Sequence, residues 1–157
     1  MLSKNIELLN RLLLEIEKTI PLKDKMNIKI SKSNIGWQLD HTLKVVNSVC
    51  TILAKKHSKK YKKNFNLLRS VLFTLGYIPR GKAKAPKFVN EQKPISSESL
   101  YEQLNNAKTH LKRVESLSEN AYFIHHAFGT LSKNKTIRFL EIHTKHHLKI
   151  VNDILNK

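Results

Sequence analysis

Three histidines stand within five positions near the end of the chain, in the segment EIHTKHHLKI at residues 141–150. Two of them, His143 and His147, are four residues apart, a spacing that puts their side chains on adjacent turns of one helix face. Imidazole nitrogens placed in this way can bind one metal ion together. The pair is not an HExxH motif, because Thr144 stands where zinc proteases have their glutamate base. The segment therefore predicts part of a metal site, without protease chemistry of that type.

A third histidine, His41, falls on another apolar pattern with helical spacing, formed by Trp37, His41, Val45, Ser48 and Ile52. The last helix has a comparable stripe at Ile137, Leu140, His147, Val151 and Ile154. We expect both faces to be buried, so that the three imidazoles meet in a site with an open coordination position, as in a catalytic metal centre. For His41 alone, a hydrogen-bonded core histidine is the commoner reading, and it stays open.

Other residues are expected near this site. His146 is offset by about 60–100° from the pair on the helix, so it flanks the metal as an outer-shell residue or stands on a polar rim. His125, in HHAFG, either faces the metal from a loop or caps the approach to the last helix. Trp37, one turn before His41, is a third candidate for contact with the site or its substrate. No side chain is assigned a catalytic role.

The composition of the chain limits the classes of partner that it is expected to bind. The chain has 157 residues, enough for one domain, and 29 Lys and Arg against 12 Asp and Glu give it a net charge of +17. This charge favours an anionic partner, unless it reflects compositional drift. The single cysteine, Cys50, excludes an internal disulfide, and no segment has the apolar length of a signal peptide or a membrane span. We therefore expect a cytoplasmic protein with no membrane partner.

Part of the charge is concentrated in residues 55–93, which contain 12 Lys and Arg and one acid, Glu91. One interpretation is that this segment covers the site and recruits a small anionic substrate through Arg80, Lys82, Lys84 and Lys87. A second is nucleic-acid binding, with stacking on Tyr61, Tyr77 and Phe88. A solvated cationic face with neither role is the third.

The periodicity predicts helices at about 3–20, 34–57 and 132–156, a further one opening at Ser97, and a short apolar one within 61–77. Residues 118–133 are interpreted as a loop, because no segment shows a convincing period of two. We therefore expect one all-α domain over 1–157. Its architecture would be a four-helix bundle with a long crossover between helices two and three, plus one short extra helix.

Three segments, WQLDHTLKVV, IPRGKAKAPK and HHAFGTLSKNKTIRFLEIHTKHHLKIV, resemble the DinB-like (YfiT-like) metalloenzyme superfamily, specifically a bacterial branch of unknown function. The resemblance covers nearly the whole chain. It implies a four-helix bundle with a long crossover and a divalent metal held by His41, His143 and His147. Some members of the superfamily are thiol transferases or isomerases that use a low-molecular-weight thiol. Imidazole ligands suit Zn, Ni, Cu or Fe, of which we expect Zn or Ni.

Together these observations predict a metal-dependent enzyme of the hydrolase or thiol-transferase type. Its substrate would be a small anionic molecule, its nucleophile a metal-activated water or thiol, and its assembly could be a homodimer. The alternative is a basic helical module that binds nucleic acid and whose metal site is structural or vacant.

Overall fold

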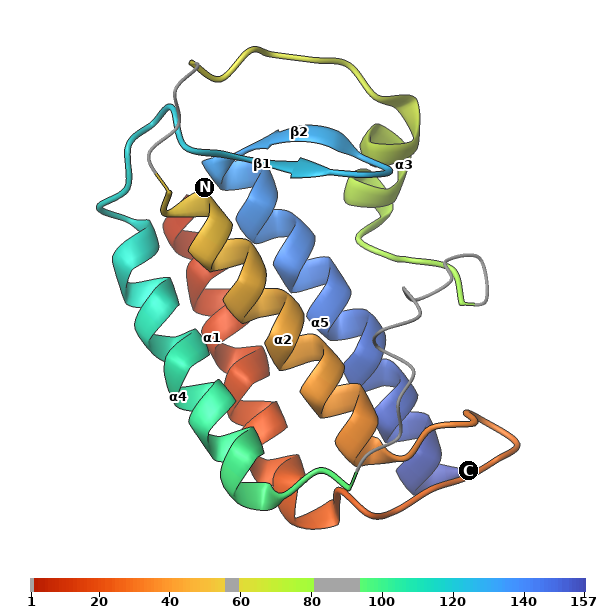
Figure 1. Cartoon of the computed structure of the whole chain (residues 1–157). Coiled ribbons are helices and arrows are strands. Elements are labelled where there is room, and N and C mark those ends of the chain that lie inside the picture. The colour runs from red at the N-terminus through yellow and green to blue at the C-terminus, as the bar shows by residue number, and fades with distance from the viewer. Residues whose placement is uncertain (1, 56–59, 81–93) are drawn as a thin grey trace.

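The computed structural model describes residues 2–55, 60–80 and 94–157, and the protein is mostly helical. Its helices are α1 (Leu2–Thr19), continued by a short 3-10 turn at Ile20–Leu22, α2 (Ile35–Leu53), α3 (Leu67–Leu75), α4 (Ser97–Val114) and α5 (Lys133–Asn156). Two short strands, β1 (Tyr122–His125) and β2 (Gly129–Ser132), form the sheet (Figure 1).

The four long helices lie side by side, while α3 and the hairpin sit near one end of the group (Figure 1). Helix α2 packs against α4 and α5, and α1 packs against the same two helices. Leucine and isoleucine side chains from all four fill one continuous core, in which residues such as Leu13, Leu43, Leu104 and Leu140 are fully buried. This core fixes α2 beside α5, the two helices that carry the histidines.

The helices begin where short polar side chains satisfy their first backbone N–H groups. Asn34 accepts a hydrogen bond from the backbone N–H of Trp37, so α2 begins at Ile35, close to the predicted start at about residue 34. Helix α4 begins at Ser97, as predicted, and is capped by Ser96. Gly76 ends α3 in the left-handed region at φ 63°, a conformation that glycine adopts without strain.

Two details of α2 differ from the sequence-based expectation. The helix ends at Leu53, not near 57, and residues 56–59 lie outside the described residues. Of the predicted inward stripe, Ser48 and Ile52 are exposed, because the core face of α2 is formed by Leu39, Leu43, Val46 and Leu53. His41 consequently lies at the edge of the core, half-buried.

The predicted loop at 118–133 contains an antiparallel hairpin, so this prediction was wrong. Its register pairs Tyr122 with Ser132 and His125 with Gly129, around a three-residue turn. Gly129 has φ 69°, the left-handed geometry that such turns require. The strands are only four residues long, too short for their alternation to be distinguished from an irregular segment.

Buried Arg69 joins α3 to this hairpin. Its guanidinium donates to the side-chain and backbone oxygens of Asn64 at 2.7 and 2.6 Å, and to the backbone carbonyl of Phe128 at 3.0 Å. Arg138 of α5 donates to the carbonyl of Phe73 at 3.2 Å. These bonds fix α3 against both the hairpin and α5. In the described parts of the chain, no helix combines the length and apolarity that crossing a membrane requires.

Candidate metal centre

His41 on α2 and the pair His143 and His147 on α5 converge between the two helices, as the sequence predicted. Each contributes one ring nitrogen to a group in which all three atoms lie within 4.8 Å of one another. The ring centroids are 4.7 Å apart for His41 and His147, and 4.6 Å apart for the α5 pair. Among the described residues, this is a group of imidazoles without carboxylate or thiolate members.

The orientation of His147 is set by an amide on α2. Its Nδ1 lies 2.7 Å from Oε1 of Gln38 in a buried hydrogen bond. Because an amide oxygen only accepts, Nδ1 carries the proton and Nε2 keeps its lone pair. Gln38 is itself held, since its Nε2 donates to Oγ of Ser31 at 3.2 Å. An outer-shell acceptor of this kind is a regular feature of metal-binding histidines.

His143 differs from His147 in the surroundings of its Nδ1 atom. Its Nδ1 is buried, and no hydrogen-bond partner for it is found among the described residues. A buried polar atom without a partner is uncommon, and each case needs a physical reason. A metal ion shared with His41 and His147 would supply the missing partner.

Burial keeps the three rings neutral. It lowers the pKa of His143 to about 3, with the nearby His41, His146 and His125 acting in the same direction. The pKa of His147 is lowered well below its ordinary value by burial and by His143. Burial also lowers the pKa of His41, although the Asp40 carboxylate partly opposes this. Neutral imidazoles present the lone pairs that a metal needs.

Trp37 covers His41. The two rings are stacked, with centroids 5.1 Å apart and planes within 1° of parallel. The neighbouring carboxylate of Asp40 points to other partners, because it accepts from Gln103 at 2.9 Å and pairs with Lys44 at 2.7 Å. Trp37 therefore forms a wall beside His41 in the candidate site.

His146 flanks the site. Its ring meets that of His147 edge-on at 5.1 Å, and its Nδ1 donates to the backbone carbonyl of Ile78 at 3.0 Å. Burial lowers the pKa of His146, although the bond to Ile78 opposes the shift. His146 thus ties the chain after α3 to the edge of the metal group, and Nε2 remains as an acceptor.

His125 does not join the metal group. Its Nδ1 accepts the backbone N–H groups of Ala127 and Phe128 at 3.1 and 3.2 Å, so in the neutral ring the proton resides on Nε2. Its ring packs on Phe139, which in turn contacts His143. The ring of His125 therefore closes the hairpin turn, whereas the cap of α5 is Ser132.

The basic residues expected to bind an anion are only partly described. Arg80 forms an ion pair with Asp153 at 2.6 Å, so its charge is already matched. Lys82, Lys84, Lys87 and Phe88 lie outside the described residues. Tyr77, a proposed stacking surface, has the ammonium group of Lys149 over its ring at 5.6 Å.

Cys50 is buried in the core, and burial raises the pKa of its thiol to about 12, which excludes it as a reactive thiolate at neutral pH.

The residues present fit a divalent ion. Three neutral nitrogen donors converge, one is oriented by an outer-shell amide, and one is buried without another partner. Nitrogen atoms that each lie about 2.0–2.1 Å from one zinc ion are closer to one another than the three ring nitrogens are here. Small rotations of the rings would bring them to that separation. The three-histidine set leaves coordination positions open.

The chain matches no protein-family model, no curated protein and no solved structure.

Gln38 and Ser31 were not anticipated from the sequence. Gln38 lies three residues before His41, so helical spacing alone places it near that ligand. Its bond, however, is to His147 on the other helix, and no local pattern announces a contact between positions so far apart.

Proposed function

We propose that this protein is a metal-dependent enzyme of the DinB-like kind, with α1, α2, α4 and α5 as a four-helix bundle and a long crossover from α2 to α4. The observation that carries the proposal is the convergence of the ring nitrogens of His41, His143 and His147 within 4.8 Å. Three neutral imidazoles with coordination positions left over are typical of a catalytic metal and not of a closed structural site. Zn or Ni is the ion proposed.

A divalent ion held there would act as a Lewis acid, lowering the pKa of a bound water or thiol and polarising a substrate oxygen. The protein's own groups prepare the site. Gln38 fixes the ring of His147 and keeps its Nε2 lone pair available. Trp37 covers one face of His41 and excludes water from that side.

His146 is the group best placed to handle a proton. Its Nδ1 proton is committed to the carbonyl of Ile78, and its lowered pKa keeps Nε2 unprotonated at neutral pH. A neutral imidazole at the edge of the site can accept a proton at Nε2 from a nucleophile beside it. The carboxylate of Glu141, by contrast, is buried between Arg138 and Lys145 at 2.6 Å each and is occupied by them.

The substrate proposed is a small anionic molecule, since cations outnumber acids across the chain.

Hydrolase and thiol-transferase chemistry differ in whether water or a thiol occupies the coordination position that the histidines leave open. Replacing the metal with Co²⁺ separates them, because a thiolate on cobalt gives an intense near-ultraviolet charge-transfer band that water does not. We expect the cobalt protein to show visible bands of a nitrogen-rich site, and a small thiol to add that band if thiol transfer is the reaction. Absence of any cobalt spectrum would contradict the proposal.

A further inference from the structure

Helix α3 presents an apolar face to the solvent. Leu67, Val71 and Leu75 follow one another at a spacing of four residues, and their side chains are 67%, 47% and 66% exposed. Leu68, next to this row, is 51% exposed, and Phe65, just before the helix, is 81% exposed. We refer to these five residues as the α3 patch. Of the twelve exposed large hydrophobic side chains in the described part of the chain, five belong to it, so the exposure is clustered and not scattered.

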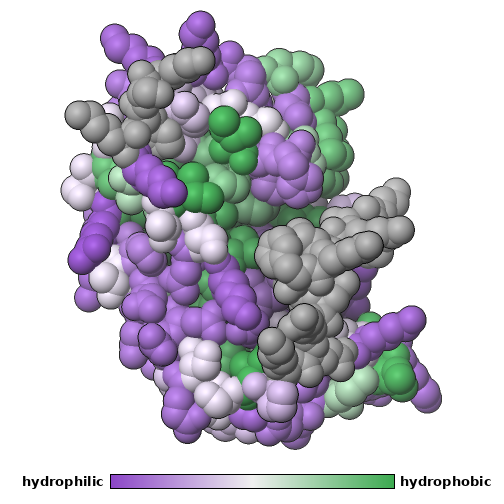
Figure 2. Space-filling view, in the orientation of Figure 1, coloured by the Kyte–Doolittle hydropathy of each residue, from purple (hydrophilic) through white to green (hydrophobic). Residues whose placement is uncertain are grey.

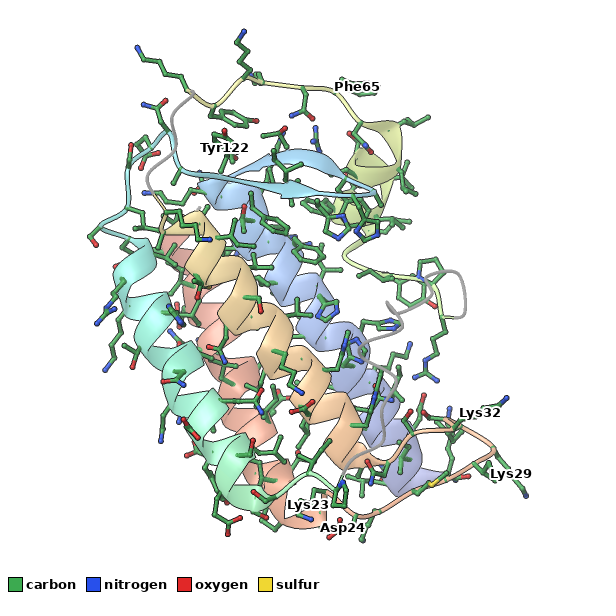
Figure 3. All side chains as sticks on the ribbon, in the orientation of Figure 1. Lys23, Asp24, Lys29, Lys32, Phe65 and Tyr122 are labelled. Atoms are coloured by element: carbon green, nitrogen blue, oxygen red, sulfur yellow. The ribbon has the colours of Figure 1, made fainter. Side chains whose placement is uncertain are left out.

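The patch is visible on the surface. Figure 2 shows hydrophobic atoms gathered at the upper right, where α3 lies in Figure 1. Figure 3 shows Phe65 on the outer side of the chain that leads into α3. The exposed residues therefore face away from the core of the molecule.

The opposite face of α3 explains why the leucines point outward. Arg69 is buried there and donates to carbonyl groups of Asn64 and of the hairpin. Phe73 packs edge-on against Phe128 at 5.6 Å, and its carbonyl accepts from Arg138. Rolling the helix to hide the leucines would break these bonds and leave buried polar groups unpaired. The outward apolar face is therefore fixed by the fold.

Positive charge accompanies the patch. Lys60, Lys62 and Lys63 are exposed on the segment that enters α3, and none has a carboxylate partner among the described residues. The pKa of Lys135 is lowered by burial and by the nearby charges of Arg69 and Lys63. Cations here repel one another without nearby acids to compensate, which creates a local demand for anions.

We propose that the α3 patch and its three lysines form a docking surface for an anionic lipid bilayer. Leucine, valine and phenylalanine side chains would enter the boundary between headgroups and acyl chains, while the lysines would meet lipid phosphates. Helix α3 has nine residues, so it would lie in the plane of the membrane surface and not cross it. The inference goes beyond the proposed enzyme activity and does not depend on it.

Two other occupants fit less well. A second copy of this chain would bring two sets of unpaired lysines together, in a protein whose net charge is already +17. A nucleic acid would satisfy the lysines, but its sugar-phosphate surface offers no apolar environment for Leu67, Val71 and Leu75. Of these three occupants, a bilayer with anionic headgroups is the one that matches both the charge and the aliphatic side chains.

Sedimentation of the full-length protein with vesicles tests this proposal. We expect binding to phosphatidylcholine vesicles that contain phosphatidylglycerol and little binding to phosphatidylcholine alone. The double substitution Leu67→Ser/Leu75→Ser should weaken binding to the anionic vesicles by about tenfold or more, because two apolar side chains no longer enter the lipid. Leu14→Ser, at a half-exposed leucine of α1, is the matched control and should bind like the wild type.

Four results would overturn the proposal or assign the surface to another partner. No binding to anionic vesicles overturns the proposal. Equal binding by the wild type and the double variant would show adsorption by charge alone, and would also overturn it. A wild-type dimer that the double substitution separates, without vesicle binding, would identify the patch as a contact between copies. Tight binding to a mixed-sequence oligonucleotide with no vesicle binding would assign the lysines to nucleic acid.

Discussion

The Nδ1 atom of His147 lies 2.7 Å from Oε1 of Gln38, although 109 residues separate the two positions in the chain. Because Gln38 stands on α2 and His147 on α5, the packing of these helices decides the tautomer of a histidine in the candidate metal site. The anchoring of Gln38 on Ser31 extends this control to the loop that precedes α2.

Replacing Gln38 by leucine should therefore lower metal affinity about 10- to 100-fold, the usual cost of losing an outer-shell acceptor. Gln38→Glu retains an acceptor for Nδ1 and should bind metal at least as tightly as the wild type. Competition with a chromophoric chelator measures both affinities. Asn47→Leu, which removes a partly buried amide from the same helix, is the control and should leave affinity unchanged. Equal affinities for Gln38→Leu and the wild type would show that Gln38 does not position the ligand.

Metal binding at pH 6 should release at most about one proton. Burial lowers the pKa of His143 to about 3 and that of His147 well below its ordinary value, so these two rings are neutral in the apo protein at this pH, and burial lowers the pKa of His41 as well. Calorimetric titration with Zn²⁺ in buffers of different ionisation enthalpy gives the number of protons released per bound ion. Release of two or three protons per ion would mean that the rings are charged in the apo protein.

The metal-free protein should lose stability as the pH falls below 6.5. A histidine that is neutral when folded but protonated when unfolded favours unfolding between its unfolded pKa near 6.5 and its lower folded value. Each such histidine contributes a slope of at most about 1.4 kcal/mol per pH unit. Urea unfolding between pH 7 and 5, above the range where carboxylates titrate, isolates this effect. His143→Phe should make the slope shallower, and an unchanged slope would contradict the assigned burial.

The sequence was informative about the long helices because each has a 3.6-residue apolar period, and α2, α4 and α5 also begin at a capping side chain. The end of α2 was missed because apolar spacing fades gradually into the lysines that follow, where no glycine or proline marks a stop. The hairpin was missed for a different reason. Its four-residue strands hold their place partly through Arg69, whose bonds to the hairpin are contacts between residues far apart in the chain.

Of the candidate site, only the convergence of the three histidines was predictable from the sequence. His143 and His147 share a helix, so their spacing alone brings them together, and His41 was recognisable as a polar residue on an apolar pattern. The roles of Gln38 and of Arg80 depend on partners in other segments. Spacing along the chain carries no information about such pairs.

Arg69→Met should lower the free energy of unfolding by about 2–4 kcal/mol, because it removes several buried hydrogen bonds and leaves the hairpin carbonyls unpaired. Arg69→Lys should not restore it, since one ammonium group cannot reproduce the guanidinium fork. Urea unfolding at pH 7 measures the change. The exposed substitution Lys62→Met serves as a control and should stay within about 0.5 kcal/mol of the wild type. A similarly small effect of Arg69→Met would show that α3 is not held by this residue.

Metal content tests the central claim most directly. The protein should be purified without an affinity tag, loaded with Zn²⁺ or Ni²⁺, dialysed, and examined by elemental mass spectrometry beside four alanine variants. We predict about one ion per chain in the wild type and in His146→Ala, and loss of most of the metal in His41→Ala, His143→Ala and His147→Ala, with helicity by circular dichroism largely retained. Stoichiometric metal in all three ligand variants, or none in the wild type, would contradict the three-histidine centre.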